Sequence, residues 1–132
     1  MKKNIIFLLF LFFANANDNF YYQKDKKIFL TPIDTTQTIQ KKESNQTVQY
    51  YKTSKGQTVG ISKEIIVKVI EEKAIDSLVE KYDINVKKKL TQKLYLVEAN
   101  STKETLATTN ELYDDENVSY AHPNFIKRID KR

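Results

Sequence analysis

The chain lacks most of the residues on which small catalytic or metal-binding domains depend. It contains no cysteine, two glycines and a single histidine. Without cysteine it can form neither a disulfide nor a thiolate metal site, so a fold must rely on its apolar core. His122 has no cluster of further ligands around it, as a zinc site would need. Two glycines do not make a phosphate-binding loop, and no nucleophile motif of a hydrolase is present. The composition predicts a non-catalytic protein without metal or cofactor.

Basic side chains outnumber acidic ones, 22 to 17, which gives a formal net charge of +5. Without Lys2 and Lys3 the excess falls to 20 against 17. The lysines are interspersed rather than gathered into a basic stripe, so we expect them to keep the surface solvated. Neither nucleic acid nor an anionic membrane is expected as a partner.

Residues 1–16 have the three parts of a secretory signal peptide. Two lysines are followed by an unbroken apolar run at residues 5–13, and Ala14, Asn15 and Ala16 form an A-x-A cleavage site. This run is too short to span a bilayer, which takes about 20 residues. We therefore expect export to the periplasm or the outside of the cell, without membrane attachment after cleavage.

Residues 17–62 contain two hairpin patterns and a polar stretch. FYYQ and KIFL flank one polar turn at residues 23–26, and VQYYK and QTVGI flank another at residues 53–56. Both patterns predict β-hairpins. Residues 34–46 between them are rich in Thr, Gln and Lys and have almost no apolar side chain, which predicts a flexible linker.

Residues 63–126 alternate between strand and helix periodicity, which predicts one compact unit. We expect strands near residues 65–69, 86–90, 94–98 and 118–122, and helices at 74–82 and 102–113, the second with a capping box at residues 101–104. The order βαββαβ predicts an α+β, ferredoxin-like sandwich with both helices on one face of a four-stranded antiparallel sheet. Residues 127–132 are expected to form an extended tail after Pro123.

Alternation along the strands assigns side chains to two sheet faces. The face under the helices is expected to hold Ile65, Val67, Val69, Val86, Leu94, Leu96, Val118 and Tyr120. The opposite face is expected to hold Ile66, Lys68, Lys87, Lys89, Tyr95, Val97, Ser119 and Ala121. No helix covers this second face, so it is a candidate docking surface; the alternatives are a solvated face or one covered by the N-terminal hairpins.

The succession EIIVKV, a helix ending in KYDI, KLYLVE, a helix ending in ELYDD, and NVSYAHPNF resembles the N-terminal propeptide of secreted subtilisin-like serine proteases. The resemblance covers residues 63–129, roughly half of the chain. FYY and KIFLTP, with YYKTSKGQTVGIS after them, are similar to the leader that precedes this domain in some bacterial subtilases.

The resemblance implies an intramolecular chaperone and temporary inhibitor, whose open sheet face rests on the catalytic domain. Its docking residues would be Ile66, Tyr95, Val97 and Ala121. Its tail would lie in the substrate cleft and consist of Ile126, Lys127, Arg128, Ile129, Asp130, Lys131 and Arg132.

The leading hypothesis is an exported domain that binds, inhibits or helps to fold a subtilisin-like serine protease. The protease would be supplied in trans or encoded downstream in a split gene. The alternative is a secreted interaction module unrelated to proteolysis, and a third reading is a subunit of a multi-chain protease.

Three weaker signals carry two readings each. His122 could respond to acid, or simply lie at a strand end beside Pro123. The acidic run at residues 114–116 lacks the alternating spacing of a calcium loop, and a helix-ending turn explains it. Asn100 and Asn117 begin N-x-S/T patterns and are possible glycosylation sites, although such short patterns arise often by chance.

Overall fold

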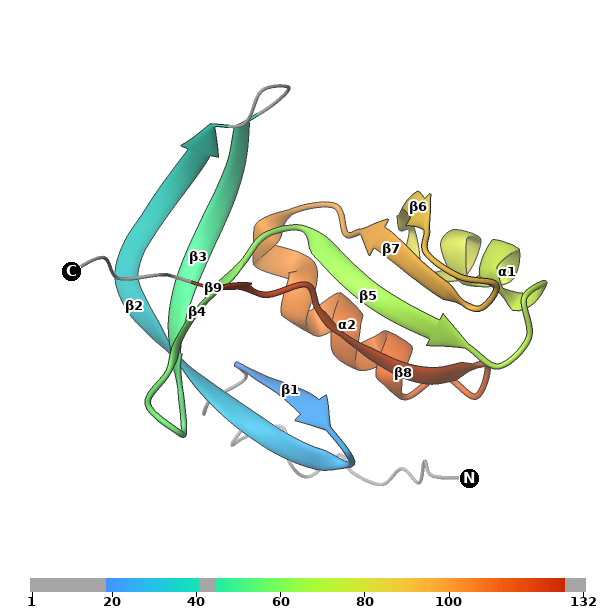
Figure 1. Cartoon of the computed structure of the whole chain (residues 1–132), viewed down its shortest axis with the longest axis horizontal. Helices are drawn as coiled ribbons and strands as arrows, with labels where there is room; N and C mark the ends of the chain where they lie inside the picture. The colour runs from blue at the N-terminus through green and yellow to red at the C-terminus, as the bar shows by residue number, and fades with distance from the viewer. Residues whose placement is uncertain (1–18, 41–44, 128–132) are drawn as a thin grey trace, which may run out of the picture.

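The computed structural model describes residues 19–40 and 45–127. The predicted signal peptide at residues 1–16 lies outside these ranges, as do residues 128–132 of the predicted tail. The structure consists mostly of strands, which form two antiparallel sheets accompanied by two short helices (Figure 1). No helix of the described part is both long and apolar enough to cross a membrane.

The first sheet has five strands. Their order is β1 (Phe20–Gln23), β2 (Lys26–Gln40), β3 (Asn45–Thr53), β4 (Thr58–Ile61) and β9 (Ile126–Lys127). Both predicted hairpins are confirmed. Lys24 and Asp25 have φ angles of 52° and 67°, which suit a two-residue hairpin turn. In the second turn, Gly56 has a φ of 87°, and the Thr53 hydroxyl accepts the N–H groups of Lys55 and Gln57.

The stretch predicted as a flexible linker belongs to this sheet instead. Residues 34–40 continue β2, and the pairing with β3 runs from Thr36 opposite Gln49 to Gln40 opposite Asn45. The prediction was wrong because a strand ladder is held by main-chain hydrogen bonds and does not require apolar side chains, while threonine suits a pleated strand. Residues 41–44 lie outside the described ranges.

The second sheet has four strands in the order β6 (Asn85–Lys89), β7 (Leu94–Glu98), β5 (Glu64–Val69) and β8 (Val118–Pro123). Helix α1 (Ala74–Tyr82) buries Ile75 and Leu78. Helix α2 (Thr105–Tyr113) follows a short 3₁₀ turn, η2 (Thr102–Glu104). The predicted capping box is wrong, because the Ser101 side chain makes no cap hydrogen bond.

The predicted fold class is also wrong, although the elements of residues 64–123 follow one another in the predicted order. The four-stranded sheet is curled, and the chain is not a ferredoxin-like two-helix sandwich. Helix α2 places Leu112 in the core under the four-stranded sheet, and Leu106 in a second core with Leu30, Val59 and Ile61. The helix therefore serves both sheets, and β9 returns to pair with β4. Local periodicity does not reveal such sharing.

Candidate functional site

Three of the four predicted docking residues lie on the other side of the sheet. Tyr95, Val97 and Ala121 are 4%, 0% and 1% exposed and belong to the core under the helices. Val67 pairs with Tyr95 on one side and with Ala121 on the other, and directly paired residues share a face. The predicted face is wrong for these three residues. Only Ile66 stays on the open face, where it is partly exposed.

A β-bulge explains the error in β8. Lys68 pairs with Tyr120 while Val69 pairs with Val118, so Ser119 is an extra residue. An extra residue reverses the alternation of side chains beyond it. Val118 is therefore buried like Ala121, three positions away, whereas Tyr120 is 36% exposed. The open face consequently presents Tyr120 rather than burying it.

The predicted cleft-binding tail begins inside the first sheet. Ile126 and Lys127 form β9 and pair with Gly60 and Val59 of β4. A Cβ atom at Gly60 would lie 2.7 Å from the Val48 side chain and 3.3 Å from the Ile126 carbonyl oxygen, so the glycine permits this close approach. Residues Arg128, Ile129, Asp130, Lys131 and Arg132 lie outside the described ranges.

The possible glycosylation sites lie on the surface. Asn100 and Asn117 are exposed. The Asn100 amide donates a 2.9 Å hydrogen bond to Asp83, and the Asn117 main-chain N–H donates a 2.8 Å bond to Asp115. The Asn117 side chain is left accessible, whereas modification of Asn100 would replace its bond to Asp83. Glycosylation stays a prediction.

A groove of about 610 Å³ lies between the two hairpins of the first sheet and strand β8. This volume is in the range of pockets that hold a small ligand or an anchoring side chain. Its ring-bearing residues come from β1, the end of α2, β8 and the segment after β8: Tyr21, Tyr22, Tyr113, Tyr120, His122 and Phe125. In Figure 1, β1 lies beside β8, the edge strand of the second sheet, with α2 behind β8.

Contacts between rings hold the groove walls in place. Tyr22 stacks on Tyr113 with 4.4 Å between ring centroids and 16° between planes. Tyr21 meets Phe125 edge to face at 4.8 Å. The Tyr113 hydroxyl donates to the Asp25 carboxylate and accepts the Asp25 main-chain N–H at 3.1 Å. The tip of the first hairpin is therefore fastened to the end of α2.

Three tyrosines of the groove, Tyr21, Tyr22 and Tyr113, have a raised pKa and are neutral at physiological pH. Burial raises the pKa of Tyr21 above its ordinary value of 10.0. Burial, followed by the charge of Asp114, does the same for the pKa of Tyr22. For Tyr113, burial and then the Asp25 carboxylate raise the pKa. Phenols in this state donate hydrogen bonds and bury apolar ring surface, and they are poor nucleophiles.

His122 and Asp25 already have partners within the groove. The His122 ring stacks on Tyr120 at 5.7 Å with 14° between planes, and its Nδ1 lies 3.0 Å from the Pro123 carbonyl oxygen. Asp25 is engaged by Tyr113. The acidic and imidazole groups here support the walls, so the arrangement suits binding rather than acid–base chemistry.

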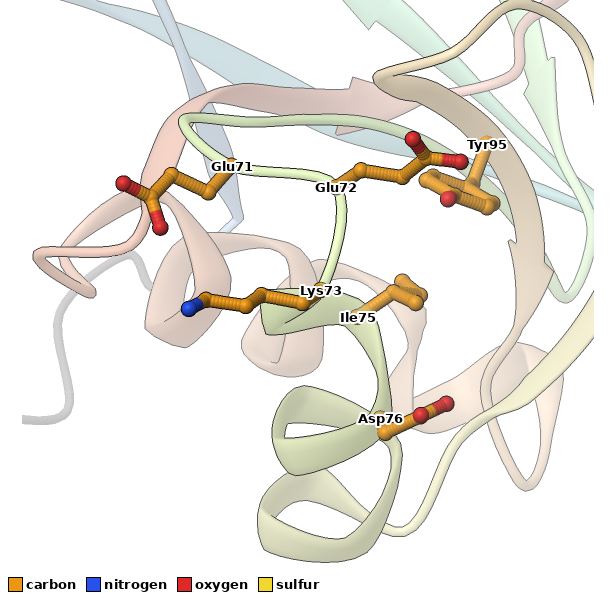
Figure 2. Close-up of a pocket in the computed structure, with 6 residues that line it drawn as sticks. All are labelled: Glu71, Glu72, Lys73, Ile75, Asp76 and Tyr95. Atoms are coloured by element: carbon orange, nitrogen blue, oxygen red, sulfur yellow. The ribbon is translucent and has the colours of Figure 1, made fainter.

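A second hollow, of about 570 Å³, lies at the start of α1 (Figure 2). Three carboxylates line it, but Glu72 forms an ion pair with Lys89, and the side chains of Glu71 and Asp76 point away from each other in Figure 2. Among the described residues, no group of three His, Cys, Asp or Glu side chains could hold a metal ion. This hollow is an open, charged surface rather than a built site.

Sequence reasoning missed the groove and its tyrosines. The signal that could have been used was the pair of adjacent tyrosines in the FYYQ strand. Adjacent residues on a strand point to opposite faces, so the two rings must pack against different parts of the chain. The Tyr21 ring packs against Phe125, and the Tyr22 ring stacks on Tyr113. Those partners lie about 90 to 100 positions away along the chain, a separation that local patterns do not bridge.

No curated protein sequence and no solved structure matches the chain. Residues 12–127 match one family, which is described as the Open reading frame 2 N-terminal domain. The match spans both sheets as one domain. The resemblance to a subtilisin propeptide had instead treated the residues before residue 63 as a leader and residues 63–129 as the domain. That resemblance is therefore wrong as an assignment. The chain belongs to the family described as the Open reading frame 2 N-terminal domain.

Proposed function

We propose that the chain is a non-catalytic protein-binding module whose docking surface is the aromatic groove with the adjoining open sheet face. The observation that carries the proposal is the groove itself, where four tyrosines meet at one opening. Tyrosine is enriched at protein interfaces because its ring buries apolar area while its hydroxyl keeps a hydrogen bond. Rings already held by their neighbours lose little conformational entropy on binding.

The groove continues onto the open face of the four-stranded sheet. Tyr120 and His122 border the groove and pair with Lys68 and Ile66 of β5. The Lys68 ammonium lies 6.0 Å from the Tyr120 ring centroid. Leu96, paired with Ile66 from the other neighbouring strand, is partly exposed beside them. A partner seated in the groove would thus also reach apolar side chains on the sheet.

A subtilisin-like protease as the partner was implied by the propeptide resemblance, and it has no separate support once the family match replaces that resemblance. The alternative, an interaction module unrelated to proteolysis, is still supported, because that hypothesis depends only on an accessible docking surface and not on the propeptide resemblance. Export stays a prediction from residues 1–16. Intact-mass measurement of the protein from the exported fraction tests it, since cleavage leaves a chain that begins at Asn17.

Site-specific photo-crosslinking in the native host tests the proposed function. A benzoyl-phenylalanine replaces Gln57, an exposed residue on the groove rim, and in the matched control replaces Glu80, an exposed residue on α1. We expect the Gln57 variant to form a discrete adduct with another protein that the Glu80 variant does not form. No adduct at Gln57, or the same adducts at both positions, would overturn the proposal. Mass spectrometry of the adduct then shows whether the partner is a protease.

A further inference from the structure

The two hairpins that form the outer wall of the groove carry an excess of positive charge. The two hairpins, residues 19–33 and 47–61, carry five lysines and one carboxylate. The lysines are all exposed: Lys24, Lys26, Lys27, Lys52 and Lys55. The carboxylate is Asp25, which Tyr113 already engages. The hairpins are therefore strongly basic, although the chain as a whole is only mildly so, and Lys24 is the hairpin lysine that lines the groove itself.

The opposite wall adds to this charge. Residues 118–125 contain no carboxylate, and Lys68 reaches over the Tyr120 ring from β5. The further carboxylate that acts on a groove residue is Asp114, which raises the pKa of Tyr22. The five hairpin lysines and Lys68 outnumber the carboxylates Asp25 and Asp114, so charge complementarity favours an anionic ligand.

The ring arrangement separates two kinds of anionic ligand. Single-stranded nucleic acids bind basic grooves by stacking bases on free aromatic faces. Here Tyr22 is stacked on Tyr113 and Tyr120 on His122, and Tyr21 packs edge-on against Phe125. These contacts already cover one face of each stacked ring, which leaves less ring face for bases than for a side chain that contacts ring edges and hydroxyls. Ring edges and hydroxyls suit an aliphatic or aromatic side chain with hydrogen-bonding main chain beside it.

We propose that the groove binds a protein segment with a large apolar or aromatic anchor residue flanked by carboxylates. This inference rests on the proposed function and names its partner's chemistry. The anchor packs among Tyr21, Tyr120 and Phe125, where buried contacts contribute most of the affinity. The flanking carboxylates face Lys24 and Lys68, whose exposed charges set the rate of association and its dependence on salt.

Titration of the full chain with labelled ligands tests the proposal. Fluorescence anisotropy compares the peptides acetyl-EELFEE-amide, acetyl-QQLFQQ-amide and acetyl-EEASEE-amide, each with a fluorescein label, and a labelled ten-residue oligothymidylate. We expect the acidic peptide with the Leu-Phe anchor to bind about tenfold tighter than either peptide that lacks one of the two features. Its affinity should fall as salt is raised.

Substitutions at exposed positions then locate the binding. The double variant Lys24→Ser/Lys68→Ser should weaken the acidic anchored peptide about tenfold and leave the glutamine peptide unchanged. Tyr120→Ser should weaken both anchored peptides. Lys73→Ser, just before α1, is the matched control and should change neither. Thermal melts confirm that the variants fold.

Equal binding of the glutamine and acidic peptides would contradict the charge requirement, and tighter binding of the oligothymidylate would overturn the peptide assignment. An equal loss in Lys73→Ser would show that binding lies elsewhere. If no peptide binds while Gln57 still crosslinks to a protein, the proposed ligand chemistry is wrong and the proposed function stands. If Gln57 forms no crosslink either, both are wrong.

Discussion

The two sheets are stabilised to different degrees. The four-stranded sheet and its helices share a core of twelve buried residues. In the described part of the chain, the core cluster of the first sheet has four buried residues, one of which, Leu106, is supplied by α2. The partly buried rings of Tyr21, Tyr51 and Phe125 pack against this cluster, and Val48 and Tyr50 are buried outside it. The first sheet thus depends on the second unit, and we expect it to open at lower free energy. The groove lies along this boundary, where a partner can add buried area to the less stable side.

The largest expected effect comes from the two leucines at opposite ends of α2. Leu112 is fully buried in the larger core, and Leu106 is 7% exposed in the smaller one. Leu112→Ala should lower the free energy of unfolding by about 3–5 kcal/mol, and Leu106→Ala by about 2–3 kcal/mol. Urea unfolding followed by circular dichroism measures both. A loss at Leu106 as large as that at Leu112 would contradict the unequal-core comparison.

A second test addresses packing inside the first sheet. Gly60→Ala places a methyl group 2.7 Å from the fully buried Val48 side chain, which has no room to move. We expect a loss of about 1–3 kcal/mol from overpacking. Gly56→Ala is the matched control, because open space surrounds it and only its φ of 87° is unfavourable, at a cost of about 1 kcal/mol. If the two variants are equally stable, β4 and β9 are not packed as tightly as their pairing indicates.

The hairpins and the helix positions could be predicted from the sequence because the patterns that indicate them are local. Lys24 and Asp25 can adopt the left-handed turn, and Ile75 and Leu78 lie at helical spacing, so both features were predictable. Which face of β7 is buried could not be predicted, because KLYLVE has apolar side chains at both alternating sets of positions. The buried side of KLYLVE is fixed by the pairing of Tyr95 with Val67, which is a tertiary contact.

The β8 register was unpredictable for a different reason. The extra residue at Ser119 leaves Val118 and Ala121 on one face, and nothing in VSYAHP marks a bulge. The groove depends on that bulge to expose Tyr120, and on ring contacts between distant segments. Candidate binding residues were thus placed on the correct strands but, for three of four, on the wrong face.

Asp115 offers a third test, on the more stable side of the comparison. Burial alone would raise the pKa of this carboxyl, but hydrogen bonds from Tyr82, from the Asn117 N–H and from Lys81 outweigh it and hold the pKa below 3.8. Its side chain is 4% exposed, and the Tyr82 hydroxyl donates to it at 2.7 Å. A lowered pKa in the folded state stabilises the fold above about pH 4, and this contribution is lost as the pH falls further.

The free energy of unfolding should therefore drop on acidification below about pH 4, and Asp115→Asn should flatten this drop. At neutral pH the variant should lose about 1 kcal/mol. Burial, then Asp115, also raises the pKa of Tyr82 to about 12, so its contribution is present below pH 10 and is lost towards pH 12. Urea titrations at several pH values measure both limits. An unchanged acid limb in Asp115→Asn would show that other carboxyls cause the drop.

The smallest expected effect reports directly on the groove wall. Tyr113→Phe keeps the ring that stacks on Tyr22 but removes the oxygen that accepts the Asp25 N–H at 3.1 Å. Stability should fall by less than about 1 kcal/mol, while hydrogen exchange at the Asp25 amide should accelerate about fivefold. The Leu30 amide, bonded to the Asn19 carbonyl at 2.8 Å at the base of the same hairpin, should not change.

The two amides distinguish two ways in which the first sheet can depend on the second. Leu30 is fully buried in the small core, so its protection reflects packing, whereas Asp25 is exposed and is fastened to α2 by the Tyr113 hydroxyl. Acceleration at Asp25 alone means that the tip moves while the base stays packed, and the groove can then widen for a partner without unfolding the sheet. Equal acceleration at both amides means instead that one hydroxyl holds the whole hairpin against α2. In that case the groove wall would detach as a unit, and the small core would contribute less than its buried leucines indicate.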